Sequence, residues 1–114
     1  FEETIRKIVG DAIAVETVVE DVAIEAPFDT ATVDLMASVL RAEDPGARAV
    51  PYMISGGTDA KAFTRIGIDC YGLSPLQMPA DLDYWRLFHG VDERVPVDGL
   101  KFGVRVLDRF LRSC

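Results

Sequence analysis

The stretch Val50-Pro51-Tyr52-Met53-Ile54-Ser55-Gly56-Gly57-Thr58-Asp59-Ala60 decides the expected fold. Residues 50–54 form a short continuous apolar run, which is typical of a buried strand. The two glycines end the run, and Thr58 and Asp59 are residue types that often begin a helix. The stretch therefore predicts a strand that leads through a tight turn into a helix.

Two further strands are expected on either side of this unit. Residues 12–18 are rich in small and β-branched side chains, and residues 68–73 form another apolar run. A loop over residues 74–83 follows, because it contains two prolines. Strands that alternate with helices predict an α/β fold, with helices packed on a mostly parallel sheet.

Helices are predicted over residues 1–9, 31–42 and 59–65 and after Pro96. The second of these should begin at Asp29 or Thr30, since both residue types cap helices. The last helix has the clearest apolar face in the chain, with apolar residues at steps of 3 and 4. Its members are Val97, Leu100, Val104, Leu107 and Leu111.

Composition narrows the class of protein. The 114 residues carry a net charge of −7, which argues against a nucleic-acid partner, because binding to a phosphate backbone needs clustered Lys and Arg. No apolar run approaches the length of a transmembrane helix, so no membrane partner is expected, and no signal peptide is visible. Cys70 and Cys114 form no CxxC pair and no disulfide framework, which favours a reduced, cytoplasmic setting.

The Gly56-Gly57-Thr58 turn is a candidate anion site. Glycines let a ligand approach the backbone closely, and Thr58 offers a hydroxyl donor for a carboxylate or phosphate. The spacing matches neither a P-loop nor a dinucleotide fingerprint, so a nucleotide phosphate is disfavoured. The alternative is purely structural, because glycines are common in turns and Thr58 and Asp59 are common helix caps.

His89, the only histidine, stands in the run Leu87-Phe88-His89-Gly90-Val91-Asp92-Glu93-Arg94-Val95. A neutral imidazole in such a loop can ligate zinc, and Asp92 and Glu93 can orient it as outer partners. The alternative is a histidine with a structural role only. One histidine cannot hold a catalytic metal alone, so any metal site needs ligands from elsewhere.

Two motifs resemble the M20 metallopeptidase family, which includes aminoacylases, carboxypeptidases, succinyl-diaminopimelate desuccinylases and dipeptidases. The first is Pro51-Tyr52-Met53-Ile54-Ser55-Gly56-Gly57-Thr58-Asp59-Ala60-Lys61-Ala62-Phe63, similar to the family's P-x-x-x-x-G-G-T-D-A-R, with Lys61 at the usual arginine. The second is His89-Gly90-Val91-Asp92-Glu93-Arg94-Val95, similar to H-G-x-[ND]-E-R-[VI]. Their order and separation also fit the family.

The resemblance implies an organisation for the chain. Residues 1–18 would be the end of a lid and dimerisation domain, and residues 19–114 the C-terminal half of a zinc-peptidase-like α/β catalytic domain. The chain begins at Phe1 rather than Met, and the family's H-x-D motif and paired Glu-Glu belong upstream of the segment that the chain resembles. It is therefore expected to be the C-terminal segment of a longer enzyme, inactive by itself.

The resemblance also implies a chemistry and a set of site residues. The full enzyme would be a homodimer that uses two zinc ions, with cobalt or manganese as alternatives, to hydrolyse an amide bond of a small peptide or N-acyl amino acid with a free carboxylate. His89 would be a metal ligand. The substrate carboxylate would meet Gly56, Gly57, Thr58 and Lys61, with Asp59 holding the turn. The rival hypotheses are a non-catalytic carboxylate-binding module and a plain domain whose motifs are only caps and turns.

Overall fold

The computed structural model describes residues 1–21, 23–54 and 56–114, and in these ranges all regular structure is helical. The helices are α1 (Glu2–Val9), α2 (Ala31–Glu43), α3 (Ala60–Thr64), α4 (Tyr84–Leu87) and α5 (Val97–Ser113). No strand or sheet occurs in the described part of the chain. The predicted α/β fold with helices on a mostly parallel sheet is therefore wrong.

All three predicted strands are absent, for one physical reason. Residues 12–18, 50–54 and 68–73 run as irregular segments, and no ladder of hydrogen bonds joins any of them to another described segment. A strand exists only when a neighbouring backbone pairs with it. β-Branched and apolar composition favours the extended conformation but does not supply that neighbour.

The predicted helices are confirmed in position. Thr30 begins α2, and its hydroxyl oxygen accepts a hydrogen bond from the Val33 amide at 3.3 Å. Gly10 ends α1 with a φ of 70°, a conformation that a side chain would strain. Pro96 stands at the start of α5, where its missing N–H costs nothing. The short helix α4 was not predicted; the Asp83 carboxylate caps it by accepting from the Arg86 amide at 3.4 Å.

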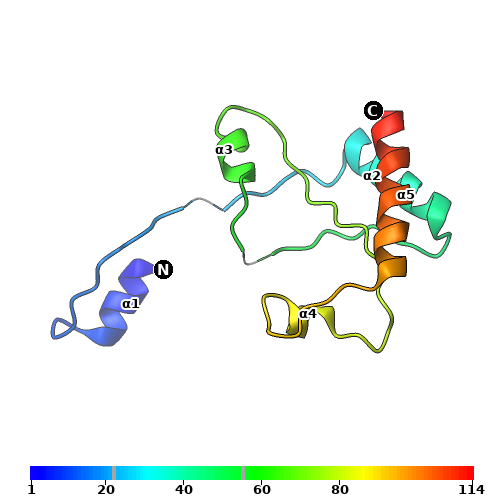
Figure 1. Ribbon diagram of the computed structural model, residues 1–114. Coiled ribbons are helices and arrows are strands. Elements are labelled where there is room, and N and C mark those ends of the chain that lie inside the picture. Colours follow the sequence, from blue (N-terminus) through cyan, green and yellow to red (C-terminus); the bar gives the residue numbers. More distant parts are fainter. Residues whose placement is uncertain (22, 55) are drawn as a thin grey trace.

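The core lies between α2 and α5, the only described helices in contact (Figure 1). Val39, Phe102 and Val106 form its centre, with Leu35, Leu40 and Phe110 packed against them. Val106 has no exposed surface. Burial of this small apolar cluster is what holds the two helices together, because hydrophobic stabilisation scales with the area removed from water.

The loop before α4 packs tightly against α5. A Cβ on Gly99 would lie 2.8 Å from the Gln77 carbonyl oxygen, and one on Gly103 would lie 2.7 Å from the Pro75 carbonyl oxygen. Both distances are far shorter than a normal carbon–oxygen contact. The two glycines therefore let the loop backbone lie directly on the helix.

The apolar face that the residue spacing predicts on α5 is not the face that is buried. Gly99, Phe102, Gly103 and Val106 are buried. By contrast, the residues with regular apolar spacing are 40–71% exposed: Val97, Leu100, Val104, Leu107 and Leu111. The helix therefore has two apolar faces, and the described structure covers only the one that contains the glycines.

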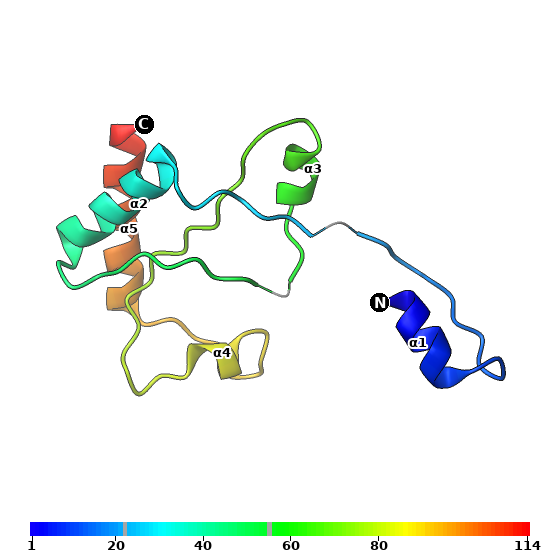
Figure 2. The ribbon, with the colours of Figure 1, turned by 180° about the vertical axis from the view of Figure 1, so that it is seen from behind.

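The molecule is open and elongated, with extents of 58 × 37 × 21 Å. Helix α1 stands apart from the other helices at the end of a long irregular segment, as both views show (Figures 1 and 2). The predicted domain boundary after residue 18 falls in this segment and stays a prediction. Within the described ranges, no helix is long and apolar enough to cross a membrane.

Candidate functional site

The Gly-Gly-Thr turn lies open to solvent immediately before α3. Gly56, Gly57, Thr58 and Asp59 are all exposed. The Thr58 hydroxyl oxygen accepts a hydrogen bond from the Ala60 amide at 3.2 Å, and the Thr58 carbonyl accepts from the Lys61 amide at 3.3 Å. Asp59 occupies the N-cap position as expected, but its side chain makes no capping bond. Thr58, rather than Asp59, therefore organises the turn, and Ser55 of the same motif lies outside the described residues.

Lys61 brings positive charge to this turn. Its Nζ atom would lie 3.9 Å from a Cβ built on Gly57, so the ammonium group stands against the bare backbone of the glycine. The same Nζ donates to the Asp21 carboxylate at 2.7 Å, and Arg65 approaches the other Asp21 oxygen at 3.6 Å. The predicted substrate-binding residues Gly57 and Lys61 are thus adjacent in space. The Asp21 carboxylate already binds the Lys61 ammonium group.

His89 lies just beyond the C-terminal end of α4. It is exposed, and its ring centroid lies 4.3 Å from that of Phe88. Its backbone adopts a φ of 59°, the only positive value among the described non-glycine residues. This left-handed conformation costs energy for most L-residues. The conformation is held by the turn Leu87–Gly90, in which His89 is the third residue and the Gly90 amide donates to the Leu87 carbonyl at 2.8 Å.

Asp92 and Glu93 are also exposed, next to His89 in sequence. The Asp92 backbone carbonyl accepts from the Arg94 guanidinium at 3.0 Å, and the Glu93 amide donates weakly to the Gly90 carbonyl at 3.4 Å. These bonds shape the loop rather than fix the imidazole. Their predicted role as outer partners of a metal ligand stays a prediction.

The described residues do not form a complete metal site. No group of three or more His, Cys, Asp or Glu side chains in the described ranges is placed to hold one ion. Catalytic zinc normally takes three protein ligands. These residues therefore do not fit zinc unaided, and His89 offers one imidazole.

The two motifs are linked through aromatic rings but do not meet. Tyr52, just before the glycine turn, stacks on Trp85 of α4 with ring centroids 5.5 Å apart. Trp85 in turn contacts Tyr84 and Phe88. However, α3 lies near the top and α4 near the bottom of both views, and the two helices make no contact (Figures 1 and 2). The described structure thus connects α4, the helix before His89, to the segment before the turn, but shows no contact between α4 and α3, the helix that carries Lys61.

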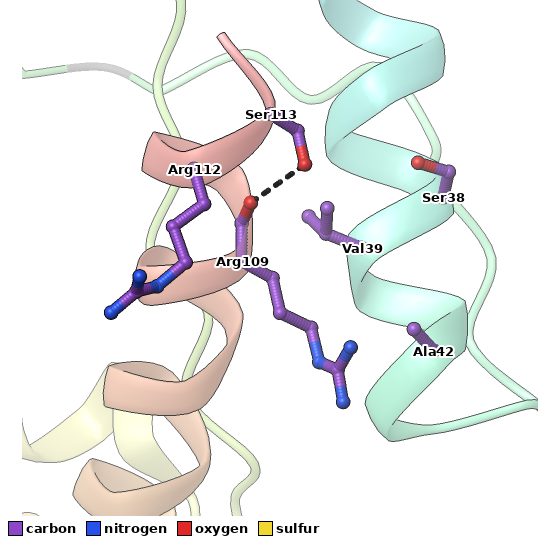
Figure 3. A pocket seen from close by; sticks show the side chains of 6 residues that line it. All are labelled: Ser38, Val39, Ala42, Arg109, Arg112 and Ser113. Atoms are coloured by element: carbon purple, nitrogen blue, oxygen red, sulfur yellow. Dashed lines mark hydrogen bonds between the residues drawn. The ribbon is translucent and has the colours of Figure 1, made fainter.

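A separate pocket of about 290 Å³ lies between α2 and α5 (Figure 3). Its walls are Ser38, Val39, Ala42, Arg109, Arg112 and Ser113. Both arginines already bind carboxylates: Arg109 contacts Glu43 at 2.6 Å, and Arg112 contacts Asp108 at 2.9 Å. None of the predicted site residues lines this pocket.

Sequence reasoning missed Asp21 and the Tyr52–Trp85 stack. Asp21 is 40 residues from Lys61, and no local pattern distinguishes it from the neighbouring acidic residues. The sequence shows aromatic residues around position 85, but no local pattern pairs them with Tyr52. Both contacts depend on long-range folding, which spacing does not encode.

Comparison with protein-family models, curated proteins and solved structures gives no match to this chain.

Proposed function

We propose that the chain is the C-terminal segment of a zinc-dependent amide hydrolase of the M20 type. In this proposal Gly56, Gly57, Thr58 and Lys61 bind the carboxylate of a small peptide or N-acyl amino acid. The observation that carries it is the pair of motifs in the family's order, of which the first places the Lys61 ammonium beside the open backbone of Gly57.

In the proposed enzyme His89 supplies one metal ligand, and the remaining ligands come from outside these residues. Bound zinc would lower the pKa of a water molecule and polarise the scissile carbonyl. The exposure of His89 and its fixed backbone leave the imidazole free to reach another surface. The proposed enzyme is a cytoplasmic homodimer, and cobalt or manganese are alternative metals.

The test is the metal content and hydrolytic rate of the complete natural protein, with N-acetyl amino acids and dipeptides as substrates. The informative variants are His89→Asn and His89→Gly, because both residue types tolerate the positive φ at this position. Loss of zinc and at least a hundredfold loss of turnover is expected in both. Arg86→Ala, an exposed change in the neighbouring helix α4, is the control and should leave both unchanged.

One observation favours a second candidate, a carboxylate-binding module without catalysis. The cationic Lys61–Arg65 cluster is assembled in the described structure, whereas a metal-ligand cluster is not. If the His89 variants keep wild-type zinc content and turnover, the hydrolase proposal is wrong. Carboxylate binding that depends on Lys61 would then support the module.

A further inference from the structure

The Asp21 carboxylate lies between two cations that belong to α3 and its C-terminal cap. Lys61 Nζ contacts Oδ2 at 2.7 Å, and Arg65 Nη2 approaches Oδ1 at 3.6 Å. Each oxygen therefore faces its own positive group. This is the arrangement in which a carboxylate from a ligand would be recognised.

The two cations are four residues apart, so they project from the same side of one helical turn. Lys61 is the better shielded of the two, with 29% of its side chain exposed against 70% for Arg65. Partial shielding makes the Lys61–Asp21 contact stronger than that of a fully solvated pair. The open backbone of Gly57 lies against the same ammonium group.

Asp21 itself comes from a different part of the chain. It lies in the segment that joins α1 to α2, and it is 40% exposed. Its contact with Lys61 spans 40 residues of sequence and holds that segment on α3. A ligand that took over Lys61 would therefore also break this contact.

We propose that Asp21 is an intramolecular competitor that occupies the carboxylate-binding position at Lys61 and Arg65 until a ligand's carboxylate displaces it. The inference rests on the proposed role of Lys61 in binding a carboxylate, and it adds a regulatory residue to that site. A competitor lowers the apparent affinity for the ligand by the fraction of molecules in which it occupies the site. Ligand binding and separation of the Asp21 carboxylate from Lys61 are then two sides of one equilibrium.

The test is a titration of the complete natural protein with sodium acetate at constant ionic strength, because salt alone weakens exposed ion pairs. Binding is followed by NMR at the Lys61 side-chain nitrogen and the Gly57 amide. In Asp21→Asn the apparent Kd for acetate should fall about fivefold, the size expected for loss of a partly exposed ion pair. Lys61→Gln should abolish the response.

Glu20→Gln is the matched control. Glu20 is an exposed acid next to Asp21, and its replacement changes the net charge by the same amount. If Glu20→Gln and Asp21→Asn gained the same affinity for acetate, the gain would come from the change in net charge alone. That result would overturn the proposal. Unchanged or weaker acetate binding in Asp21→Asn would also overturn it, because Asp21 would then be a structural partner of Lys61.

A measurement on the wild-type protein tests the proposal even if one of the variants fails to fold. Acetate should shift the Asp21 side-chain carbonyl resonance as the carboxylate leaves Lys61, and sodium chloride at equal ionic strength should not. An Asp21 resonance that stays fixed while acetate binds at Lys61 would overturn the proposal. None of these readouts depends on metal or turnover, so this inference and the hydrolase proposal can fail independently.

Discussion

Gly103 shows how one missing side chain fixes the packing of α5. Replacing glycine with alanine inside an open helix usually stabilises it by about 1 kcal/mol. At Gly103 the added Cβ would stand 2.7 Å from the Pro75 carbonyl oxygen, a backbone atom in a buried residue. Gly103→Ala should therefore destabilise the chain by about 1–3 kcal/mol, since the loop must move away from the helix. Urea unfolding followed by helical circular dichroism measures the change.

Gly72→Ala is the control for this substitution. A Cβ at Gly72 would meet no atom within 4 Å, and its φ is not positive. Replacement there should be neutral or stabilise the chain by about 0.5 kcal/mol, because it restricts the unfolded chain. If Gly103→Ala were as benign as Gly72→Ala, the close approach of the loop to α5 would be wrong.

His89 has an unusual backbone conformation. Its φ of 59° lies in the left-handed region, where glycine is favoured and where asparagine, aspartate and histidine are enriched among the other residue types. Unfavourable conformations persist where the surrounding structure imposes them, and they cluster at functional sites. At His89 the Leu87–Gly90 turn imposes the conformation, so the backbone alone does not indicate a function.

Between elements, Glu43 joins the two helices of the core. Its carboxylate accepts from Arg105 at 2.7 Å and from Arg109 at 2.6 Å, so one residue at the end of α2 binds two successive turns of α5. The side chain is only 11% exposed, whereas the arginines are about half exposed. Hydrogen bonds from both guanidinium groups hold the pKa of the Glu43 carboxyl below its ordinary value.

This pKa shift predicts that acid weakens the α2–α5 contact. A carboxyl whose pKa is lowered by folding stabilises the fold above its ordinary pKa, and that contribution disappears as the pH falls through the lower, folded-state pKa. The difference in urea midpoint between wild type and Glu43→Gln should thus be constant above about pH 5 and shrink below it. A difference that is the same at every pH would contradict this role of Glu43.

Asp108→Asn is the control for the pH series. Asp108 pairs with Arg112 one turn along the same helix, where it raises the pKa of that guanidinium. Such exposed pairs within a helix contribute little to stability. The midpoint of Asp108→Asn should therefore stay close to that of wild type across the same pH range.

The elements that sequence predicted correctly are those fixed by nearby residues. The cap at Thr30, the stop at Gly10 and the start at Pro96 each depend on a few neighbours, and all are confirmed. The strands were wrong because pairing depends on a distant backbone. The buried face of α5 was not evident because a loop packs on its glycines, which an apolar pattern does not count.

The candidate site likewise has features that nearby residues fix and features that depend on distant parts of the chain. Sequence placed Gly57 and Lys61 in one turn, and their side-by-side arrangement follows from that local spacing. The stack of Tyr52 on Trp85, which links the segment before this turn to the helix before His89, was not predicted because the two rings lie far apart in sequence. The carboxylate on Lys61 was not foreseen, because its source lies 40 residues away.

For the whole molecule, the decisive property is the apolar surface left uncovered. The radius of gyration is 18.9 Å, whereas a compact chain of this length would have about 13 Å. Among the described residues, exposed large apolar side chains far outnumber buried ones. Part of that surface lies on the regularly spaced face of α5, where Leu107 is 40% and Val104 67% exposed. Contiguous patches of this kind favour association.

Residues 1–114 by themselves should therefore self-associate and bind hydrophobic dyes. Sedimentation should show a mass that increases with concentration, since burial of these faces lowers the free energy by about 25 cal/mol per Å². Leu107→Gln and Val104→Gln should reduce the mass at a given concentration, while Lys101→Gln, an exposed change on the same helix, should have little effect. A strictly monomeric chain that unfolds in one sharp calorimetric transition would contradict the open structure, because such a transition requires a far larger core than the α2–α5 contact provides.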